Sequence, residues 1–145
     1  MGRRKVRVTL DTNILVRAFT NDDPEQAALA RNLLDRATLA VIPIPTLCEF
    51  SWVLSRSFKI APAKIAEVIG QIVDSETVLT DIPAVEAGLE MLRKGADFAD
   101  GAIAVQGLAS GGTIFASFDR KAVELWRSRG GQASDPSDLI TASDR

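Results

Sequence analysis

The chain has 145 residues, a net charge of −2, no His and a single Cys, and 19 of its residues are Asp or Glu. Its 46% hydrophobic and 25% charged residues, without an apolar stretch of membrane-spanning length or a visible secretory signal, predict one globular domain over 1–145 in the cytoplasm. A chain without His cannot form a Ser-His-Asp triad or a Cys-His couple, which leaves carboxylates and a bound Mg²⁺ or Mn²⁺ for acid-base chemistry.

A β-branched apolar run near the start ends abruptly in an acid. Residues 6–10 predict a buried strand, and Asp11, Thr12 and Asn13 follow at its carboxyl end. Ligands of open parallel α/β sheets bind outside the carboxyl ends of the strands, which would make Asp11 a site residue. An Asp here is equally well explained as the N-cap of the helix expected over 14–20. This motif alone leaves both readings open.

The next segments hold a second acid on a predicted helix. A capped helix is expected after Asp23, then a strand over 39–44 and a helix over 45–58 that carries Glu49 among apolar residues. Glu49 either stabilises the helix dipole from an exposed face or lies at the crevice rim near the tips of the first two strands. Trp52, on roughly the same face, is expected in the core or in an interface rather than in catalysis.

The middle of the chain continues the alternation of helix and strand. A helix from Pro62, a strand over 77–79 and a helix over 82–94 are expected. Such an alternation, without internal repeats, predicts an α/β fold in which a parallel sheet is covered on both faces.

Two acids then open the helix that follows Gly95. Asp97 is well placed to N-cap this helix, and Asp100 lies three residues later on the same face of the first turn. Capping explains Asp97, but Glu or Gln would reach back to the cap better than Asp does, so we interpret Asp100 as a site residue. The small residues after it, Gly101 and Ala102, permit the close approach of another backbone.

A fourth strand, expected over 113–116, ends like the first in small polar residues and an acid. Ser117 and Asp119 lie at its carboxyl end, and a helix over 120–129 follows. A short last strand is expected near 132–133. The pattern repeats the arrangement of the first strand and its acid.

Four acids are therefore expected to share one crevice: Asp11, Glu49, Asp100 and Asp119. Four like charges close together repel one another strongly, and a divalent cation relieves that repulsion. One or two Mg²⁺ ions held in this way position and activate water for attack on a phosphodiester. Arg17, Arg120 and Lys121 are candidates for contacts with phosphates, although charge on an exposed helix face usually serves solvation.

The order of these motifs resembles that of the PIN-domain nucleases and looks closest to their VapC-type ribonuclease toxins. The matching stretches are Leu10-Asp11-Thr12-Asn13, Glu49 within 47–54, Asp97 to Ala104, and Ser117-Phe118-Asp119-Arg120. Each motif is weak alone, but four in order over nearly the whole chain are specific. One departure is Gly101, where the family commonly has Ala, and Gly there would loosen the helix slightly.

The resemblance implies a three-layer α/β/α sandwich with a central, mostly parallel sheet. It also implies Mg²⁺- or Mn²⁺-dependent cleavage of RNA, a homodimer, and inhibition by the small antitoxin protein of a type II toxin–antitoxin pair. The implied catalytic residues are Asp11, Glu49, Asp100 and Asp119; of these, Asp11, Asp100 and Asp119 correspond to metal ligands, with Thr12, Asn13, Ser117 and Asp97 as supporting polar residues.

Two other functions are compatible with parts of the pattern. A phosphoacceptor domain would use an Asp at a strand tip, but it needs a Lys at a later strand end, and none is apparent. A binding module for RNA or protein would keep the fold and lack catalysis. The intact set of four acids argues against this second alternative.

Overall fold

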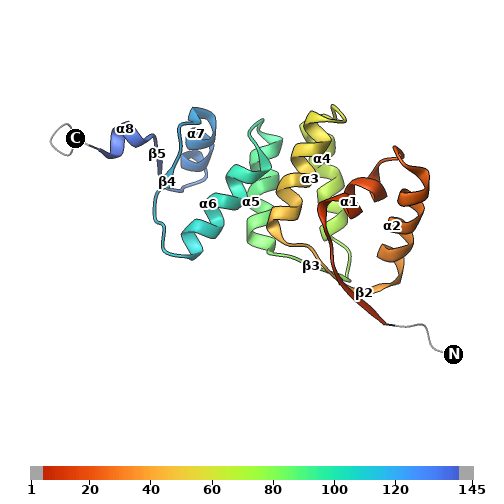
Figure 1. Cartoon of the computed structure of the whole chain (residues 1–145). Helices are drawn as coiled ribbons and strands as arrows, with labels where there is room; N and C mark the ends of the chain where they lie inside the picture. Colours follow the sequence, from red (N-terminus) through yellow and green to blue (C-terminus); the bar gives the residue numbers. More distant parts are fainter. Residues whose placement is uncertain (1–4, 141–145) are drawn as a thin grey trace. The chain divides into compact units, whose positions relative to one another are not determined.

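The computed structural model of the chain describes residues 5–140, and its internal contacts separate into two compact units. Unit 1 comprises residues 1–81 and unit 2 comprises residues 82–145 (Figure 1). Helices and strands alternate in both units. None of the helices formed by residues 5–140 is long and apolar enough to cross a lipid bilayer.

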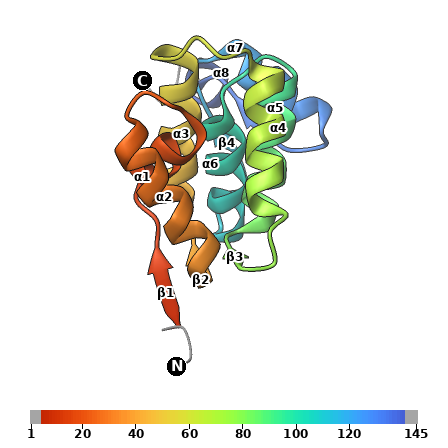
Figure 2. The ribbon, with the colours of Figure 1, turned by 90° about the vertical axis from the view of Figure 1, so that its right-hand side faces the viewer.

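Unit 1 is built on a three-stranded parallel sheet in the order β1-β2-β3. The strands are β1 (Val6–Thr9), β2 (Ala37–Val41) and β3 (Val78–Leu79). Two helices connect each strand to the next: α1 (Thr12–Phe19) and α2 (Pro24–Arg36), then α3 (Ile44–Arg56) and α4 (Pro62–Val73). β1 leads almost directly into α1 (Figure 2), which places Asp11 in the short turn between them.

Local signals account for the helix starts in unit 1: Asp side chains cap α1 and α2, and Pro lies in the first turn of α2, α3 and α4. The Asp23 side chain accepts a hydrogen bond from the Gln26 N–H at 3.1 Å, and Pro24 occupies the first turn, as predicted. The strand expected over 39–44 instead runs from Ala37 to Val41. It ends early because Pro43 and Pro45 fix backbone dihedrals that start α3.

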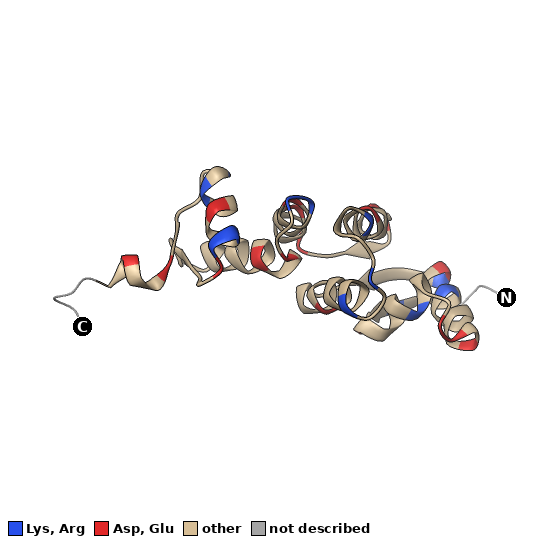
Figure 3. Cartoon of the chain, turned by 90° about the horizontal axis from the view of Figure 1, so that it is seen from above, with Lys and Arg blue, Asp and Glu red and all other residues tan. Residues whose placement is uncertain are grey.

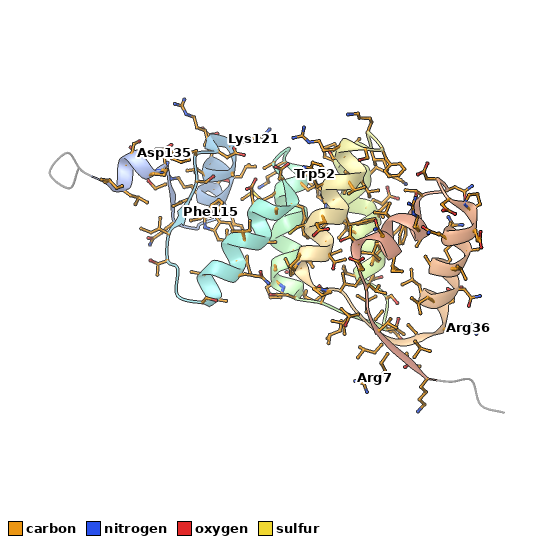
Figure 4. All side chains as sticks on the ribbon, in the orientation of Figure 1. Arg7, Arg36, Trp52, Phe115, Lys121 and Asp135 are labelled. Atoms are coloured by element: carbon orange, nitrogen blue, oxygen red, sulfur yellow. The ribbon has the colours of Figure 1, made fainter. Side chains whose placement is uncertain are left out.

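The core of unit 1 is apolar and lies between the sheet and its helices. Its fully buried side chains include Leu10, Leu15, Ile42, Leu47, Phe50, Leu54, Ile65 and Ile69. Trp52 is not part of this core, because 60% of its surface is exposed, so the core position allowed for it is wrong. The side chain projects from α3 (Figure 4).

Unit 2 contains a second, two-stranded parallel sheet and four helices. The strands are β4 (Phe115–Ala116) and β5 (Ala133–Ser134). The helices are α5 (Ile82–Arg93), α6 (Phe98–Ala109), α7 (Arg120–Ser128) and α8 (Pro136–Leu139). The expected last strand is confirmed one residue later than predicted, whereas the four-residue α8 was not predicted.

One cluster of the unit 2 core gathers small side chains around Trp126. Its buried members are Ala87, Met91, Ala96, Ala104, Val123, Trp126 and Ala133. Phe115 packs edge-on against Trp126 with ring centroids 6.4 Å apart, and the Arg129 guanidinium lies 5.2 Å from the Trp126 centroid on another side. Trp126 therefore fixes α7 against β4.

Two glycines allow α5 and α6 to pack with their backbones in close contact. A Cβ on Gly101 would lie 2.2 Å from the Ala87 carbonyl oxygen, and a Cβ on Gly88 would lie 2.6 Å from the Phe98 ring. The predicted close approach at Gly101 is confirmed. The residue therefore permits tight packing of α6 against α5, and the slight loosening of the helix by Gly stays a prediction.

Every strand pair in the described residues is parallel. This confirms the predicted α/β class and is the strand arrangement of a three-layer α/β/α fold. The predicted sheet is present as two parts, three strands in unit 1 and two in unit 2.

Candidate functional site

The predicted acids are divided between the two units. Asp11 and Glu49 belong to unit 1, and Asp97, Asp100 and Asp119 belong to unit 2. Each group has its own local chemistry, which the hydrogen bonds and burial of the side chains define.

Asp11 caps a helix and still exposes a carboxylate oxygen. It occupies the N-cap of α1, and its Oδ1 accepts a hydrogen bond from the Thr12 N–H at 2.8 Å. The capping interpretation is therefore confirmed. It does not compete with cation binding, because one oxygen serves the cap and the exposed side chain keeps the other available.

Glu49 is held at the carboxyl end of β1 by two threonine hydroxyls. The buried Thr46 hydroxyl donates to the Leu10 carbonyl at 3.0 Å and ties the start of α3 to the end of the strand. One turn later on α3, Glu49 Oε2 accepts a hydrogen bond from the Thr12 hydroxyl at 3.0 Å. The predicted position of Glu49 near the strand tip is confirmed by this bond.

Thr12 thus bridges the two acids of unit 1, whereas Asn13 faces elsewhere. Thr12 donates its N–H to Asp11 and its hydroxyl to Glu49. Asn13 lines a groove of about 500 Å³ between α1 and α2 with Arg17, Leu29 and Leu33. Arg17 pairs with Asp22 at 3.3 Å at the edge of this groove.

Asp97 stands at the N-cap of α6 without acting as a side-chain cap. Its backbone dihedrals are those of an N-cap residue, but its side chain makes no capping hydrogen bond. The predicted N-cap position of Asp97 is therefore confirmed, but the expected capping hydrogen bond to its side chain is absent. Its exposed carboxylate is left beside the first turn of α6, where Asp100 also lies.

Asp100 is a half-buried acid of unit 2 with a carboxylate oxygen that is unpaired within residues 5–140. It is half-buried, and among the described residues its Oδ2 atom is shielded from solvent without a hydrogen-bond partner. Burial raises the pKa of Asp100 above its ordinary value, the negative charges of Asp97 and Asp119 raise it further, and a hydrogen bond from the Asp97 backbone partly offsets these effects. A shielded, unpaired carboxylate oxygen is costly unless a cation or donor joins it.

Asp119 is presented by a hydrogen-bonded turn at the end of β4. It N-caps α7, with Oδ1 accepting from the Ala122 N–H at 3.2 Å. The Asp119 N–H donates to Ser117 Oγ at 3.0 Å. Ser117 therefore acts on the backbone of the turn that positions the acid.

The acids offer carboxylate oxygens as ligands, but they do not form a complete metal-coordination site within residues 5–140. Within residues 5–140, no group of three or more His, Cys, Asp or Glu side chains is arranged to hold a metal ion. The oxygen-only donor set and the unpaired Oδ2 of Asp100 nevertheless fit a hard divalent cation.

Two of the predicted phosphate contacts lie on α7, directly after Asp119. Lys121 projects from this helix (Figure 4), and its Nζ atom lies where a Cβ on Gly95 would meet it at 2.7 Å. Arg120 lies near Asp135, whose pKa is lowered mainly by hydrogen bonds from Ser137 and in a small part by the Arg120 charge.

A polar cavity beside Asp119 was not predicted. It measures about 360 Å³ and is lined by Ser117, Arg120, Val123, Glu124, Arg127, Asp135, Ser137 and Asp138. Its sequence signal was weak, because the residues come from two separate helices, α7 and α8, and from the turns before them. Elsewhere acidic and basic positions are interspersed along the helices of both units (Figure 3).

Comparison with protein families gives a match to the PIN domain over residues 8–126. The chain belongs to the PIN-domain family. PIN domains are generally metal-dependent nucleases. The matched residues belong to both units and include every candidate acid from Asp11 to Asp119. A search of curated proteins gives no match.

Proposed function

We propose that this PIN domain is a metal-dependent endoribonuclease that hydrolyses RNA phosphodiester bonds. The observation that carries the proposal is the shielded Asp100 Oδ2, which lacks a partner within residues 5–140 and lies in the field of Asp97 and Asp119. In this proposal the two units form one domain over 1–145, and Asp11, Glu49, Asp100 and Asp119 act together.

The proposed ligands of Mg²⁺ or Mn²⁺ are Asp11, Asp100 and Asp119. A bound cation supplies activation of the attacking water and stabilisation of the negative charge on the phosphate. Glu49 holds a second ion or accepts a hydrogen bond from the attacking water through Oε1, because Oε2 is engaged by Thr12. Ser117 fixes the turn of Asp119, and Asp97 adds a polar group beside the first turn of α6, whereas Asn13 lines the groove between α1 and α2.

We propose RNA as the substrate, with Arg17, Arg120 and Lys121 contacting phosphates. Arg120 and Lys121 are exposed, and neither makes an ion pair within residues 5–140. Unpaired cations beside a set of carboxylates suit a polyanion that a bound metal ion also contacts. Arg17 is the weaker donor, since Asp22 already pairs with it.

We also propose that the protein is the cytoplasmic toxin of a toxin–antitoxin pair and forms a homodimer. The motif order supports this role. The groove between α1 and α2, with Ile14, Leu29 and Leu33 in its lining, fits an amphipathic helix of the antitoxin. Co-purification with the product of the neighbouring small gene, and the molar mass in solution, test these two points.

A second candidate is a PIN-fold module that binds RNA or protein without cleaving it. The observation in its favour is that residues 5–140 contain no group of three acids arranged to hold a metal ion. The two candidates differ in one measurable property, which is metal-stimulated cleavage.

The test is cleavage of a mixed RNA pool by the full chain with Mg²⁺, with Mn²⁺ and with EDTA. We expect cleavage with either metal, none in EDTA, and background activity for Asp11→Asn and Asp100→Asn. Asp35→Asn, which makes the same charge change at an exposed position of α2, serves as the matched control and should stay active. Full activity in EDTA or in either site variant contradicts the mechanism, and metal-insensitive binding without cleavage favours the binding module.

A further inference from the structure

Phe118 is a solvent-exposed aromatic residue between the two candidate site residues Ser117 and Asp119. It is 80% exposed, and no large hydrophobic side chain within residues 5–140 is more exposed. Its neighbours in the chain are Ser117 and Asp119. An aromatic ring in this position loses the free energy of burial that a core position would provide.

The backbone around Phe118 is fixed by hydrogen bonds on both sides. The Ser117 N–H donates to the Ser134 carbonyl at 3.1 Å, which ties the preceding residue to β5. The Asp119 N–H donates to Ser117 Oγ at 3.0 Å, and the Asp119 side chain caps α7. The ring is therefore presented by a turn whose backbone is hydrogen-bonded on both sides.

The residues that flank Phe118 in the chain are polar or charged rather than apolar. Asp119 lies on one side in the chain and acts electrostatically on Asp100, and the cations Arg120 and Lys121 follow at once. A surface for an apolar protein partner would extend the hydrophobic area. An exposed ring with adjacent cations is instead the combination that binds single-stranded nucleic acid, where bases stack on aromatic faces and cations follow the phosphates.

We propose that Phe118 stacks against an unpaired base next to the scissile phosphate, while Arg120 and Lys121 contact the flanking phosphates. This inference rests on the proposed function and assigns the contact with the RNA base to Phe118. A base within a duplex has both faces covered by its stacked neighbours and offers no face to the ring. Phe118 is thus a specificity residue for unpaired RNA.

The test compares Phe118→Leu with Phe118→Trp. Leu keeps apolar area and loses the aromatic face, whereas Trp keeps the face. With an unstructured 12-nucleotide RNA and Mg²⁺, we expect Phe118→Leu to lose about 5- to 100-fold in kcat/KM, the range that corresponds to the stacking of one base. We expect Phe118→Trp to stay close to the wild type. Leu108→Ala, at another exposed apolar position of unit 2, is the control and should leave cleavage unchanged.

A second measurement reports stacking without chemistry. An RNA that contains 2-aminopurine is titrated with each variant in EDTA at low salt, and stacking quenches its fluorescence. We expect quenching by the wild type and Phe118→Trp and its loss in Phe118→Leu. We also expect the wild type to cleave the same sequence far more slowly when it is base-paired.

The two proposals fail in different ways. If the wild type cleaves RNA but Phe118→Leu cleaves and quenches equally well, the stacking role is wrong and the nuclease function stands. If Phe118→Leu changes only the oligomeric state, the ring belongs to a protein interface and the inference is overturned. If the wild type cleaves no RNA, the nuclease proposal fails, and the quenching experiment still decides whether Phe118 stacks on a base.

Discussion

The acids of unit 1 and those of unit 2 are positioned by different kinds of interaction. In unit 1, Thr12 alone donates one hydrogen bond to Asp11 and another to Glu49, and both acids stay exposed. In unit 2, Asp100 is half-buried on the helix that packs tightly against α5, and one of its oxygens has no partner among residues 5–140. Unit 1 therefore satisfies its carboxylates before any cation binds, whereas unit 2 keeps a carboxylate in a state that a cation would stabilise.

The largest effect on stability should come from the packing of α6 against α5 at Gly101. Gly101→Ala places a Cβ 2.2 Å from the Ala87 carbonyl oxygen and forces α6 away from α5. We expect a loss of about 3 kcal/mol in the free energy of unfolding, measured by urea denaturation. Gly107→Ala on the same helix has open space around it and should gain about 0.5–1 kcal/mol. Equal effects of the two substitutions would refute the packing argument.

The next effect concerns the charge of Asp100. The pKa of Asp100 is raised in the folded protein, so folding favours the protonated carboxyl. Its contribution to stability is therefore complete at pH values below the pKa of the unfolded chain, and it is lost as the pH rises through the folded-state pKa. At neutral pH, in EDTA, we expect Asp100→Asn to raise Tm by about 2–5 °C, and we expect this gain to vanish in acid. Mg²⁺ should raise the Tm of the wild type but not of the variant. A lower Tm for Asp100→Asn at neutral pH would show that the carboxylate stabilises the fold.

Removal of the Thr12 hydroxyl tests whether Glu49 in unit 1 depends on the hydrogen bond that it accepts from Thr12. Thr12→Val frees Glu49 Oε2 and should cost about 1 kcal/mol of stability. It should also lower cleavage roughly tenfold, as loss of a supporting hydrogen bond does at metal sites. Thr38→Val removes a comparable hydroxyl bond to the Val6 carbonyl and should leave cleavage unchanged. Retention of full activity by Thr12→Val would mean that Glu49 needs no such support.

The smallest effect is expected from single surface cations. Arg120→Gln and Lys121→Gln should each weaken RNA binding a few-fold and reduce the slope of log K against log salt by about 0.7, measured by fluorescence titration. Lys64→Gln, whose ammonium already pairs with Glu67 at 3.5 Å, is the control. If all three variants bind alike, α7 makes no phosphate contact.

Features that depend on a few adjacent residues were predictable from the sequence. Apolar runs placed the strands within a few residues, and Asp23 with Pro24 identified the start of α2. The α/β class followed from the alternation of elements. The acids Asp11 and Asp119 were expected at strand tips, and both lie directly after strands as helix caps.

Features that depend on distant neighbours were not predictable. The Asp97 side chain has the right position for a cap but makes no capping bond, and sequence does not specify that orientation. The role of Gly101 depends on the Ala87 backbone, which belongs to another helix. The exposure of Trp52 likewise depends on which elements pack around α3. A single turn such as α8 carries no periodicity to detect.

The capping bonds of Asp11 and Asp119 have a consequence for how this protein can change over generations. Each cap uses one side-chain oxygen, and Asn provides such an oxygen as well as Asp does. A single nucleotide change converts an Asp codon into an Asn codon, so these positions can lose their charge while both helices keep their starts. Under the proposed function, folded but inactive copies are therefore one mutation away, and a lineage could lose the proposed activity without losing the folded protein.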